Sequence, residues 1–140
     1  MTIKQLSIFI ENKDGALLNV LKLLKDNGIS IIVSTISDTR DFGIYRIICS
    51  DTEKAFRILR EKNINVTITN VYALQLADNK VGAAADAMTK IVGAGVSINY
   101  MYSFLFGGKG ILVFRTDDTQ KTEEAIMLNK FEFLSEKNFV

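Results

Sequence analysis

The feature that most constrains the fold is an internal repeat, in which residues of the same type recur 67 positions apart. Between residues 12 and 52 the two copies align without a gap. Matches at this separation include Asn12 with Asn79, Lys13 with Lys80, Gly15 with Gly82, Gly28 with Gly95, Ser30 with Ser97, Ile31 with Ile98, Gly43 with Gly110, and Asp51-Thr52 with Asp118-Thr119. So many matches in one register predict two copies of one structural unit, a first domain over residues 1–70 and a second over residues 71–140.

Hydrophobic periodicity predicts the elements of the first copy. Apolar residues alternate at Leu6, Ile8 and Ile10, which is typical of a strand, and then recur at spacings of three and four from Leu17 to Leu24, which is typical of a helix. The remaining predicted elements are a strand over 29–36, a strand over 42–49, a helix opened by Asp51-Thr52-Glu53 and ended at Asn63, and a strand over 66–69. The predicted order is βαββαβ.

The second copy repeats this order with one irregularity. Its predicted elements are strands over 72–77, 96–104, 110–115 and 131–134, and helices over 82–92 and 118–128. In its first strand the bulky residues are Leu74 and Leu76, whereas the 67-residue shift places Gln75 and Ala77 opposite Ile8 and Ile10. Because a slip of one residue would turn a strand inside out, we expect a bulge or one extra turn residue near Ala77-Asp78.

This order predicts an α+β fold of two ferredoxin-like repeats, each a four-stranded antiparallel sheet with two helices on one face. The second strand is apolar on both sides, with Ser30, Ile32, Ser34 and Ile36 on one and Ile31, Val33 and Thr35 on the other. Apolar edge strands favour pairing. We therefore expect the sheets to join edge to edge and the bare sheet face to meet a second chain, as in a homodimer.

Composition argues against several classes of function. The chain has 17 basic and 16 acidic residues, a balance that does not favour nucleic acid or an acidic membrane surface as a partner. Crossing a bilayer takes about 20 consecutive apolar residues, and the apolar runs of this chain are shorter. Its first residues show no signal-peptide pattern. With a single cysteine, Cys49, these observations favour a cytoplasmic protein in a reducing compartment.

The absence of histidine argues against enzymatic activity. No residue can serve as the commonest general base or as the commonest neutral metal ligand, and the acidic residues form no metal-ligand cluster. Cys49 is predicted to be a buried structural thiol, because no histidine is present to activate it. We therefore expect no catalytic residue, no metal and no cofactor.

The two turns that follow the first strand of each copy have the chemistry of a ligand site. The first backbone N–H groups of a helix lack internal partners and favour an anion, and Gly15 and Gly82 let a ligand approach the backbone. The amide oxygens of Asn12 and Asn79 can accept hydrogen bonds from an ammonium group. These parts suit an α-amino acid, although glycine for the turn and asparagine for local capping explain the same residues without a ligand.

The βαββαβ order, the Asn-x-x-Gly turns at residues 12–15 and 79–82, and the entries Gly28-Ile29-Ser30-Ile31 and Gly95-Val96-Ser97-Ile98 resemble the ACT domain. This is a small regulatory module of phosphoglycerate dehydrogenase, aspartate kinase and the acetolactate synthase regulatory subunit. The resemblance covers nearly the whole chain, twice. It implies a stand-alone pair of ACT domains that binds a free amino acid where two such domains lie side by side.

The resemblance also implies the residues of the site. The turn after strand one would contribute from one domain, and the start of strand two from its neighbour. By position these are Asn12, Asp14, Gly15, Ala16 and Leu17 with Asn79, Val81, Gly82, Ala83 and Ala84 in the turns, and Ser30 and Ile31 with Ser97, Ile98 and Asn99 in the strands. The implied partners are a free amino acid, a second copy of the chain and an enzyme of amino-acid metabolism.

The two turns differ from each other in residue type. Asp14 is predicted to cap its own helix and to place a negative charge where a ligand carboxylate would lie, whereas Val81 cannot. We therefore expect an anionic group to prefer the helix start at residues 82–84, with the strand around Ser30-Ile31 of the other copy as its partner surface.

Three classes of function stay open from the sequence. The first is a non-catalytic regulatory protein that binds an amino acid and favours one state of itself or of a partner. The second is a small enzyme that uses lysine, aspartate or tyrosine for proton transfer. The third is an interaction module without a ligand. The aromatic run over 100–106 fits either core packing with a dimer contact or the wall of a ligand pocket.

Overall fold

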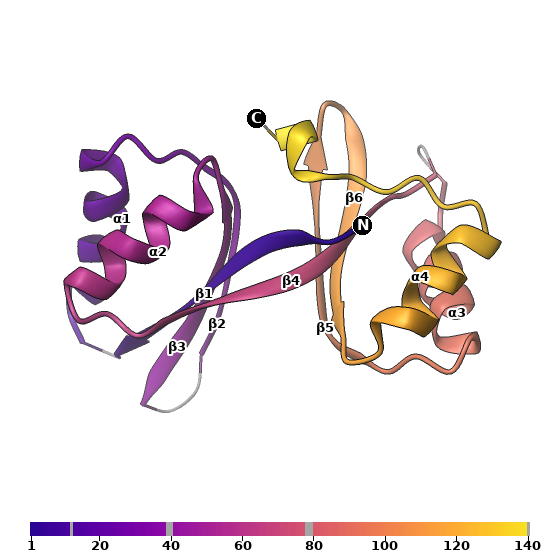
Figure 1. Cartoon of the computed structure of the whole chain (residues 1–140), viewed down its shortest axis with the longest axis horizontal. Coiled ribbons are helices and arrows are strands. Elements are labelled where there is room, and N and C mark those ends of the chain that lie inside the picture. The colour runs from indigo at the N-terminus through magenta and orange to yellow at the C-terminus, as the bar shows by residue number, and fades with distance from the viewer. Residues whose placement is uncertain (12, 39–40, 78–79, 140) are drawn as a thin grey trace. The chain divides into compact units, whose positions relative to one another are not determined.

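The computed structural model describes residues 1–11, 13–38, 41–77 and 80–139. Its elements follow the predicted order with two changes in the strands (Figure 1). They are β1 (Ile3–Glu11), α1 (Ala16–Asp26), β2 (Ile31–Asp38), β3 (Phe42–Cys49), α2 (Thr52–Glu61), β4 (Val66–Gln75), α3 (Ala83–Gly93), β5 (Ile98–Phe106), β6 (Lys109–Thr116), α4 (Thr119–Leu128) and the 3₁₀ helix η1 (Glu136–Phe139). No helix of the described ranges is long and apolar enough to cross a membrane.

The first compact unit is built mainly from residues 4–69. Strand β3 pairs antiparallel with both β1 and β2, and α1 and α2 lie together on one face of these strands (Figure 1). The alternating residues Leu6, Ile8 and Ile10 of β1 are buried under the helices against Val20 and Leu24 of α1. The period-two and period-3.6 patterns therefore meet in one core, as the sequence predicts.

The second compact unit consists of residues 1–3 and 70–138. Strand β6 pairs antiparallel with β4 and β5, and α3 and α4 lie on one face of this sheet (Figure 1). Its core contains Tyr72 and Phe114, whose ring centroids are 5.7 Å apart, packed with Leu74, Ile91 and Ile126. The predicted fold class, two βαββαβ repeats with antiparallel strands, is confirmed.

Strand β4 corrects two of the predicted strands. We predicted separate strands over 66–69 and 72–77, but the chain forms one continuous strand, Val66–Gln75. The strands are hydrogen-bonded in the order β2-β3-β1-β4-β6-β5. The reason lies in Asn70 and Val71, because neither glycine nor proline interrupts the extended backbone there.

The predicted final strand over 131–134 is also wrong. It is reduced to an isolated bridge between Leu74 and Phe133. Two backbone hydrogen bonds flank this bridge, from Gln75 N–H to the Glu132 oxygen (2.9 Å) and from Leu134 N–H to the Ala73 oxygen (2.8 Å). The chain then turns into η1, so the ladder ends after one pair.

The predicted slip in the second repeat is confirmed. Tyr72 and Leu74 occupy the core of the second unit, whereas the 67-residue shift would place Ala73 and Gln75 opposite Leu6 and Ile8. One additional residue therefore lies between Leu74 and the next helix. The proposed position at Asp78 lies outside the described residues.

The predicted faces of strand β2 are corrected by a bulge. The pairing of β2 with β3 shifts between Ile31 and Val33, and that of β5 with β6 shifts between Ile98 and Tyr100. A bulge adds one residue and reverses the alternation beyond it. Ile31 and Ile98 therefore pack against the helix-side cores, and Ile31 lies on the same side as Ser34 and not opposite to it.

The two repeats match in small details of the backbone. The Asp51 carboxylate accepts a hydrogen bond from Lys54 N–H (3.1 Å) at the start of α2, and Asp118 accepts one from Lys121 N–H (2.9 Å) at the start of α4. After these helices Asn63 and its counterpart Lys130 both adopt a left-handed conformation (φ 58° and 55°). The second copy therefore preserves backbone conformations as well as element order.

Candidate functional site

Each strand-to-helix turn is closed by a glycine in the left-handed conformation. Gly15 has φ 82° and ψ −4°, and Gly82 has φ 82° and ψ 9°. The backbone N–H of the next residue donates to a carbonyl three residues earlier, Ala16 to Lys13 (3.2 Å) and Ala83 to Lys80 (3.3 Å). L-amino acids with side chains strongly disfavour this conformation, so glycine is needed for the turn.

The predicted cap at Asp14 is wrong. The N-cap residue of α1 is Gly15, and no side chain forms a capping hydrogen bond there. The same is true of α3, whose N-cap residue is Gly82. The left-handed glycine places Asp14 one residue before the capping position, so its carboxylate does not bond the first helical N–H groups. The two turns are therefore more alike than residue types predict.

Both helices consequently begin with unsatisfied backbone donors. The first intrahelical hydrogen bonds are those of Asn19 N–H to the Gly15 oxygen and Asp86 N–H to the Gly82 oxygen, both 2.9 Å. Within the described part of the chain, no capping acceptor faces the N–H groups between them, those of residues 17–18 and 84–85. Uncapped donors at a helix start, with the helix dipole behind them, favour an anion.

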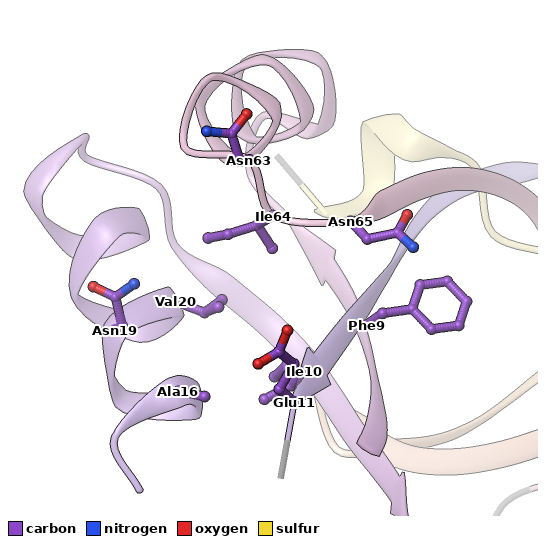
Figure 2. A pocket seen from close by; sticks show the side chains of 9 residues that line it. All are labelled: Phe9, Ile10, Glu11, Ala16, Asn19, Val20, Asn63, Ile64 and Asn65. Carbon is purple, nitrogen blue, oxygen red and sulfur yellow. The ribbon is translucent and has the colours of Figure 1, made fainter. Parts of the chain in front are cut away.

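A cleft lies beside the first turn (Figure 2). It has a volume of about 560 Å³ and lies between the end of β1, the first half of α1 and the segment that joins α2 to β4. Its lining residues are Phe9, Ile10, Glu11, Ala16, Asn19, Val20, Asn63, Ile64 and Asn65. The Phe9 ring points to the opposite side of β1 from α1, so this residue lines the cleft with its backbone (Figure 2).

A second cleft of about 660 Å³ lies beside the second turn. Its lining residues are Gln75, Leu76, Ala77, Lys80, Ala83, Asp86, Ala87, Thr89, Lys90, Lys109, Lys130, Phe131 and Glu132. Six described residues of this set, Ala83, Asp86, Ala87, Lys130, Phe131 and Glu132, lie 67 positions after Ala16, Asn19, Val20, Asn63, Ile64 and Asn65 of the first cleft. Both volumes are within the range of about 300–1,000 Å³ that is typical of small-molecule sites.

Sequence reasoning missed most of the polar cleft residues. Asn63 was recognised only as a helix end, and Asn19 and Asn65 were not singled out. The available signal was the cluster of two asparagines around Ile64, directly after a helix and before a strand. Only the fold shows that this segment faces the turn after β1.

The structure does not bring the two halves of the implied site together within one repeat. Ser30 and Ile31 follow the C-terminal end of α1, whereas Gly15 and Ala16 begin it. At 1.5 Å per residue, the eleven residues of α1 separate these groups by about 16 Å. A contribution from a neighbouring strand two therefore stays a prediction.

The strand residues already have partners of their own. Ser30 N–H donates to the Ser50 hydroxyl and Ser50 N–H to the Ser30 carbonyl, both at 2.9 Å. The Asn99 side-chain amide donates to Asp117 (3.2 Å). Ser97 is exposed, and Ile98 packs partly against the core. Asn12 and Asn79 lie outside the described residues.

Titratable side chains give no sign of a catalytic centre in the described ranges. Burial raises the pKa of the Cys49 thiol, so the predicted buried thiol is confirmed. Burial, followed by the charge of Glu123, raises the pKa of Tyr72 to about 12. Both groups therefore stay protonated at neutral pH. They lie in the cores and line neither cleft. The described residues contain no cluster of three or more metal-ligating side chains.

The aromatic run on β5 is half-buried. Tyr100, Tyr102, Phe104 and Phe106 share the sheet face opposite the helices, because the bulge separates them from Ile98. The rings of Phe104 and Phe106 meet edge to face at 6.5 Å. None of these residues lines either cleft, so the run is not a wall of these pockets.

Solved structures with this fold include regulatory proteins. A crystal structure of protein BT0572 from Bacteroides thetaiotaomicron has a TM-score of 0.91 and 36% identity, and the match covers 99% of this chain and 95% of that one. The ligand-free regulatory subunit of aspartate kinase from Thermus thermophilus has a TM-score of 0.64 at 12% identity, over 91% of this chain and 90% of that one.

A larger enzyme shares the fold over a part of its length. Aspartokinase III from E. coli, crystallised with lysine and aspartate, has a TM-score of 0.51 at 14% identity, over 91% of this chain and 31% of that one. No curated protein matches the chain. The family model described as the ACT domain pair matches residues 1–140. The duplicated βαββαβ order and the matching turns agree with that match, and the chain belongs to the ACT domain pair family.

Proposed function

We propose that this protein binds a free amino acid or a similar small metabolite at its strand-to-helix turns and acts as a non-catalytic regulator. The observation that carries the proposal is the pair of equivalent clefts, each beside an uncapped helix start that follows a left-handed glycine. Ligand binding would favour one state of a homodimer or of an associated enzyme of amino-acid metabolism.

The parts of each cleft suit the two charged groups of an α-amino acid. A carboxylate matches the open N–H groups at the helix start, where the dipole is positive. An ammonium group needs acceptors, and the first cleft offers the Asn19, Asn63 and Asn65 amides and the Glu11 carboxylate at its rim. The start of strand two of a neighbouring repeat remains the proposed source of further contacts.

The relatives support a regulatory role. One structural neighbour is a regulatory subunit of aspartate kinase, and another is an aspartokinase crystallised with lysine and aspartate. These proteins share the fold at low identity, so they support the class of function and do not define the ligand of this chain.

The second candidate is an interaction module that needs no ligand. It is favoured by apolar side chains that are strongly exposed in the chain, Leu128 (83%) and Met127 (63%) on α4 and Leu105 (80%) on β5. A partner that covers them would not require an occupied cleft.

A thermal-shift screen of the twenty amino acids separates the two. A ligand at a hundred times its dissociation constant stabilises the folded state by about 2.7 kcal/mol, and we expect a clear increase of Tm for one or a few amino acids. If no amino acid raises Tm, the interaction module is the better account.

Ala84→Glu tests the helix start directly, with Ala84→Gln as the matched control. A carboxylate near a helix N-terminus is compatible with the helix but repels a bound anion. The Glu variant is expected to lose the ligand-induced shift, and the Gln variant to keep most of it. Equal shifts in both variants would contradict binding at this helix start.

A further inference from the structure

The two clefts have a similar backbone conformation, but their lining side chains differ in charge. Three asparagines of the first cleft correspond, at the 67-residue shift, to three charged residues of the second. The pairs are Asn19 with Asp86, Asn63 with Lys130, and Asn65 with Glu132. A lining made of neutral amides on one side has thus become a lining of ionised groups on the other.

The second cleft has an excess of positive charge. Among the described residues, four lysines line it, Lys80, Lys90, Lys109 and Lys130, together with two carboxylates, Asp86 and Glu132. The described lining of the first cleft contains no lysine or arginine and one carboxylate, Glu11. A ligand that matches the described lining of the second cleft therefore has a net negative charge, whereas the described lining of the first cleft offers such a ligand no cationic side chain.

Among the described residues of the second cleft, Asp86 is paired with one of the four lysines. The Lys80 ammonium lies 3.3 Å from the Asp86 carboxylate, so this pair is internally compensated. Lys90 lies over the Phe131 ring, 5.6 Å from its centroid, which holds its ammonium group at the cleft. Glu132 then stands as an acceptor among lysines, the arrangement that a ligand with two anionic groups and one ammonium group matches.

Backbone strain is retained at one of these lysines. Lys130 adopts φ 55°, where its counterpart Asn63 has φ 58°. Asparagine tolerates the left-handed region, but a lysine there costs on the order of 1 kcal/mol. Strain of this kind persists where the residue has another role, and here the residue lies at the cleft.

We propose that the second cleft selects an acidic amino acid, with two carboxylates and an ammonium group, and that the first cleft does not. This inference rests on the proposed function, since it defines the ligand class of one of the two sites. The ligand's α-carboxylate lies at the open helix start before Ala84. Its second carboxylate is bound by the lysines, with Lys130 as the residue that determines the preference for charge.

The test uses ligand pairs that differ only in side-chain charge. Isothermal titration calorimetry compares aspartate with asparagine and glutamate with glutamine on the full chain. We expect one of the acids to bind at least about three-fold more tightly than its amide, because exposed ion pairs contribute modestly to affinity. This preference should shrink between about 50 mM and about 500 mM salt as the charges are screened.

The variant Lys130→Asn makes the second cleft like the first and relieves the strained backbone. It should therefore fold at least as well as the parent chain, while the preference for the acid over the amide is lost. Lys130→Arg keeps the charge and should retain the preference. Lys22→Gln, which removes an exposed lysine of α1 that lines neither cleft, should leave the preference unaltered.

The outcomes separate this inference from the proposed function. If no amino acid binds, the proposed function fails and this inference fails with it. If amino acids bind but acids and amides bind equally, or Lys130→Asn leaves the preference intact, only this inference is overturned. Competition by inorganic phosphate as strong as that by the preferred acid would also overturn it, because it would show a general anion site.

Discussion

Gly15 and Gly82 show how one backbone conformation is kept in both repeats. Both have φ 82°, and a Cβ placed on either would meet nothing within 4 Å. The requirement for glycine is therefore conformational and not a matter of space. This also explains why the sequence could locate the turns, since a glycine after an alternating strand and before an amphipathic helix is a strong signal.

Gly15→Ala and Gly82→Ala should each destabilise the protein by about 1 kcal/mol, because alanine disfavours the left-handed conformation. Urea unfolding measures this change. The matched control is Gly93→Ala in α3, where φ is not positive and the added Cβ also meets nothing within 4 Å. There alanine should stabilise by about 0.5–1 kcal/mol. Neutral effects at residues 15 and 82 would contradict the conformational explanation.

Tyr72 predicts a pH dependence at high pH. Burial raises its pKa to about 12, from an ordinary value of 10.0. The folded state therefore keeps a proton that the unfolded chain loses, so the stabilisation is complete below pH 10 and is lost as pH rises toward about 12. Urea midpoints between these pH values should fall more steeply for the parent chain than for Tyr72→Phe. Parallel profiles would exclude Tyr72 as the cause.

The polar residues of the clefts show the limit of prediction from sequence at this scale. Asn63 and Lys130 are far from the turns along the chain, and no local pattern links a helix end to a strand end 50 residues earlier. Only the packed fold brings them together. The place of the site, inferred from residue types at the turns, stays a prediction, and those residue types gave no sign of the opposite wall of the cleft.

At the scale of elements, the two kinds of helix start in each repeat differ. Helices α2 and α4 are capped by the carboxylates of Asp51 and Asp118, whereas α1 and α3 begin without a side-chain cap. The sequence predicted where α2 and α4 begin, and it predicted the cap at Asp14 wrongly. The error arose because an aspartate before a helix satisfies the capping pattern, and the left-handed glycine that displaces it is a three-dimensional feature.

Alanine substitutions test this difference. Asp51→Ala and Asp118→Ala should each cost about 1 kcal/mol, the usual effect of losing an N-cap hydrogen bond. Asp14→Ala should change stability by less than about 0.5 kcal/mol, as is typical of an exposed residue without a specific interaction. Denaturant unfolding of the three variants measures these changes. A loss of stability in Asp14→Ala equal to those in Asp51→Ala and Asp118→Ala would contradict the absence of a cap at Asp14.

The strands were predicted less well than the helices. The bulges after Ile31 and Ile98 leave no mark in composition, yet they reverse the faces of the residues that follow. The two predicted strands merge into β4, whose hydrogen-bonded neighbours are β1 and β6. Strand pattern indicates alternation, but register and length are set by pairing partners that a single sequence does not reveal.

At the scale of the whole molecule, the first residues of the chain belong to the core of the second unit. Residues 1–3 cluster with residues 70–138, Ile3 is 1% exposed, and Met1 packs against the core around Tyr72 and Phe114. The division into residues 1–70 and 71–140 follows the repeat along the sequence and stays a prediction.

Ile3→Ala should therefore destabilise the protein by about 2–4 kcal/mol through the cavity it leaves. Hydrogen exchange should show that amides of the second core, such as those of Phe114 and Ile126, lose protection. The exposed Leu18→Ala in α1 is the control and should have little effect. Loss of protection confined to the first core would contradict the assignment of residue 3.

The central claim, that the uncapped helix starts beside the two clefts bind an amino acid, is tested most directly by a ¹H–¹⁵N NMR titration of the full chain. The screen of twenty amino acids identifies the ligand to add. The account predicts saturable shifts of the amide signals of residues 17–18, of residues 84–85, or of both, because these N–H groups gain an acceptor. Saturable shifts that leave all four amides unchanged, or no shift with any amino acid at millimolar concentration, would contradict it.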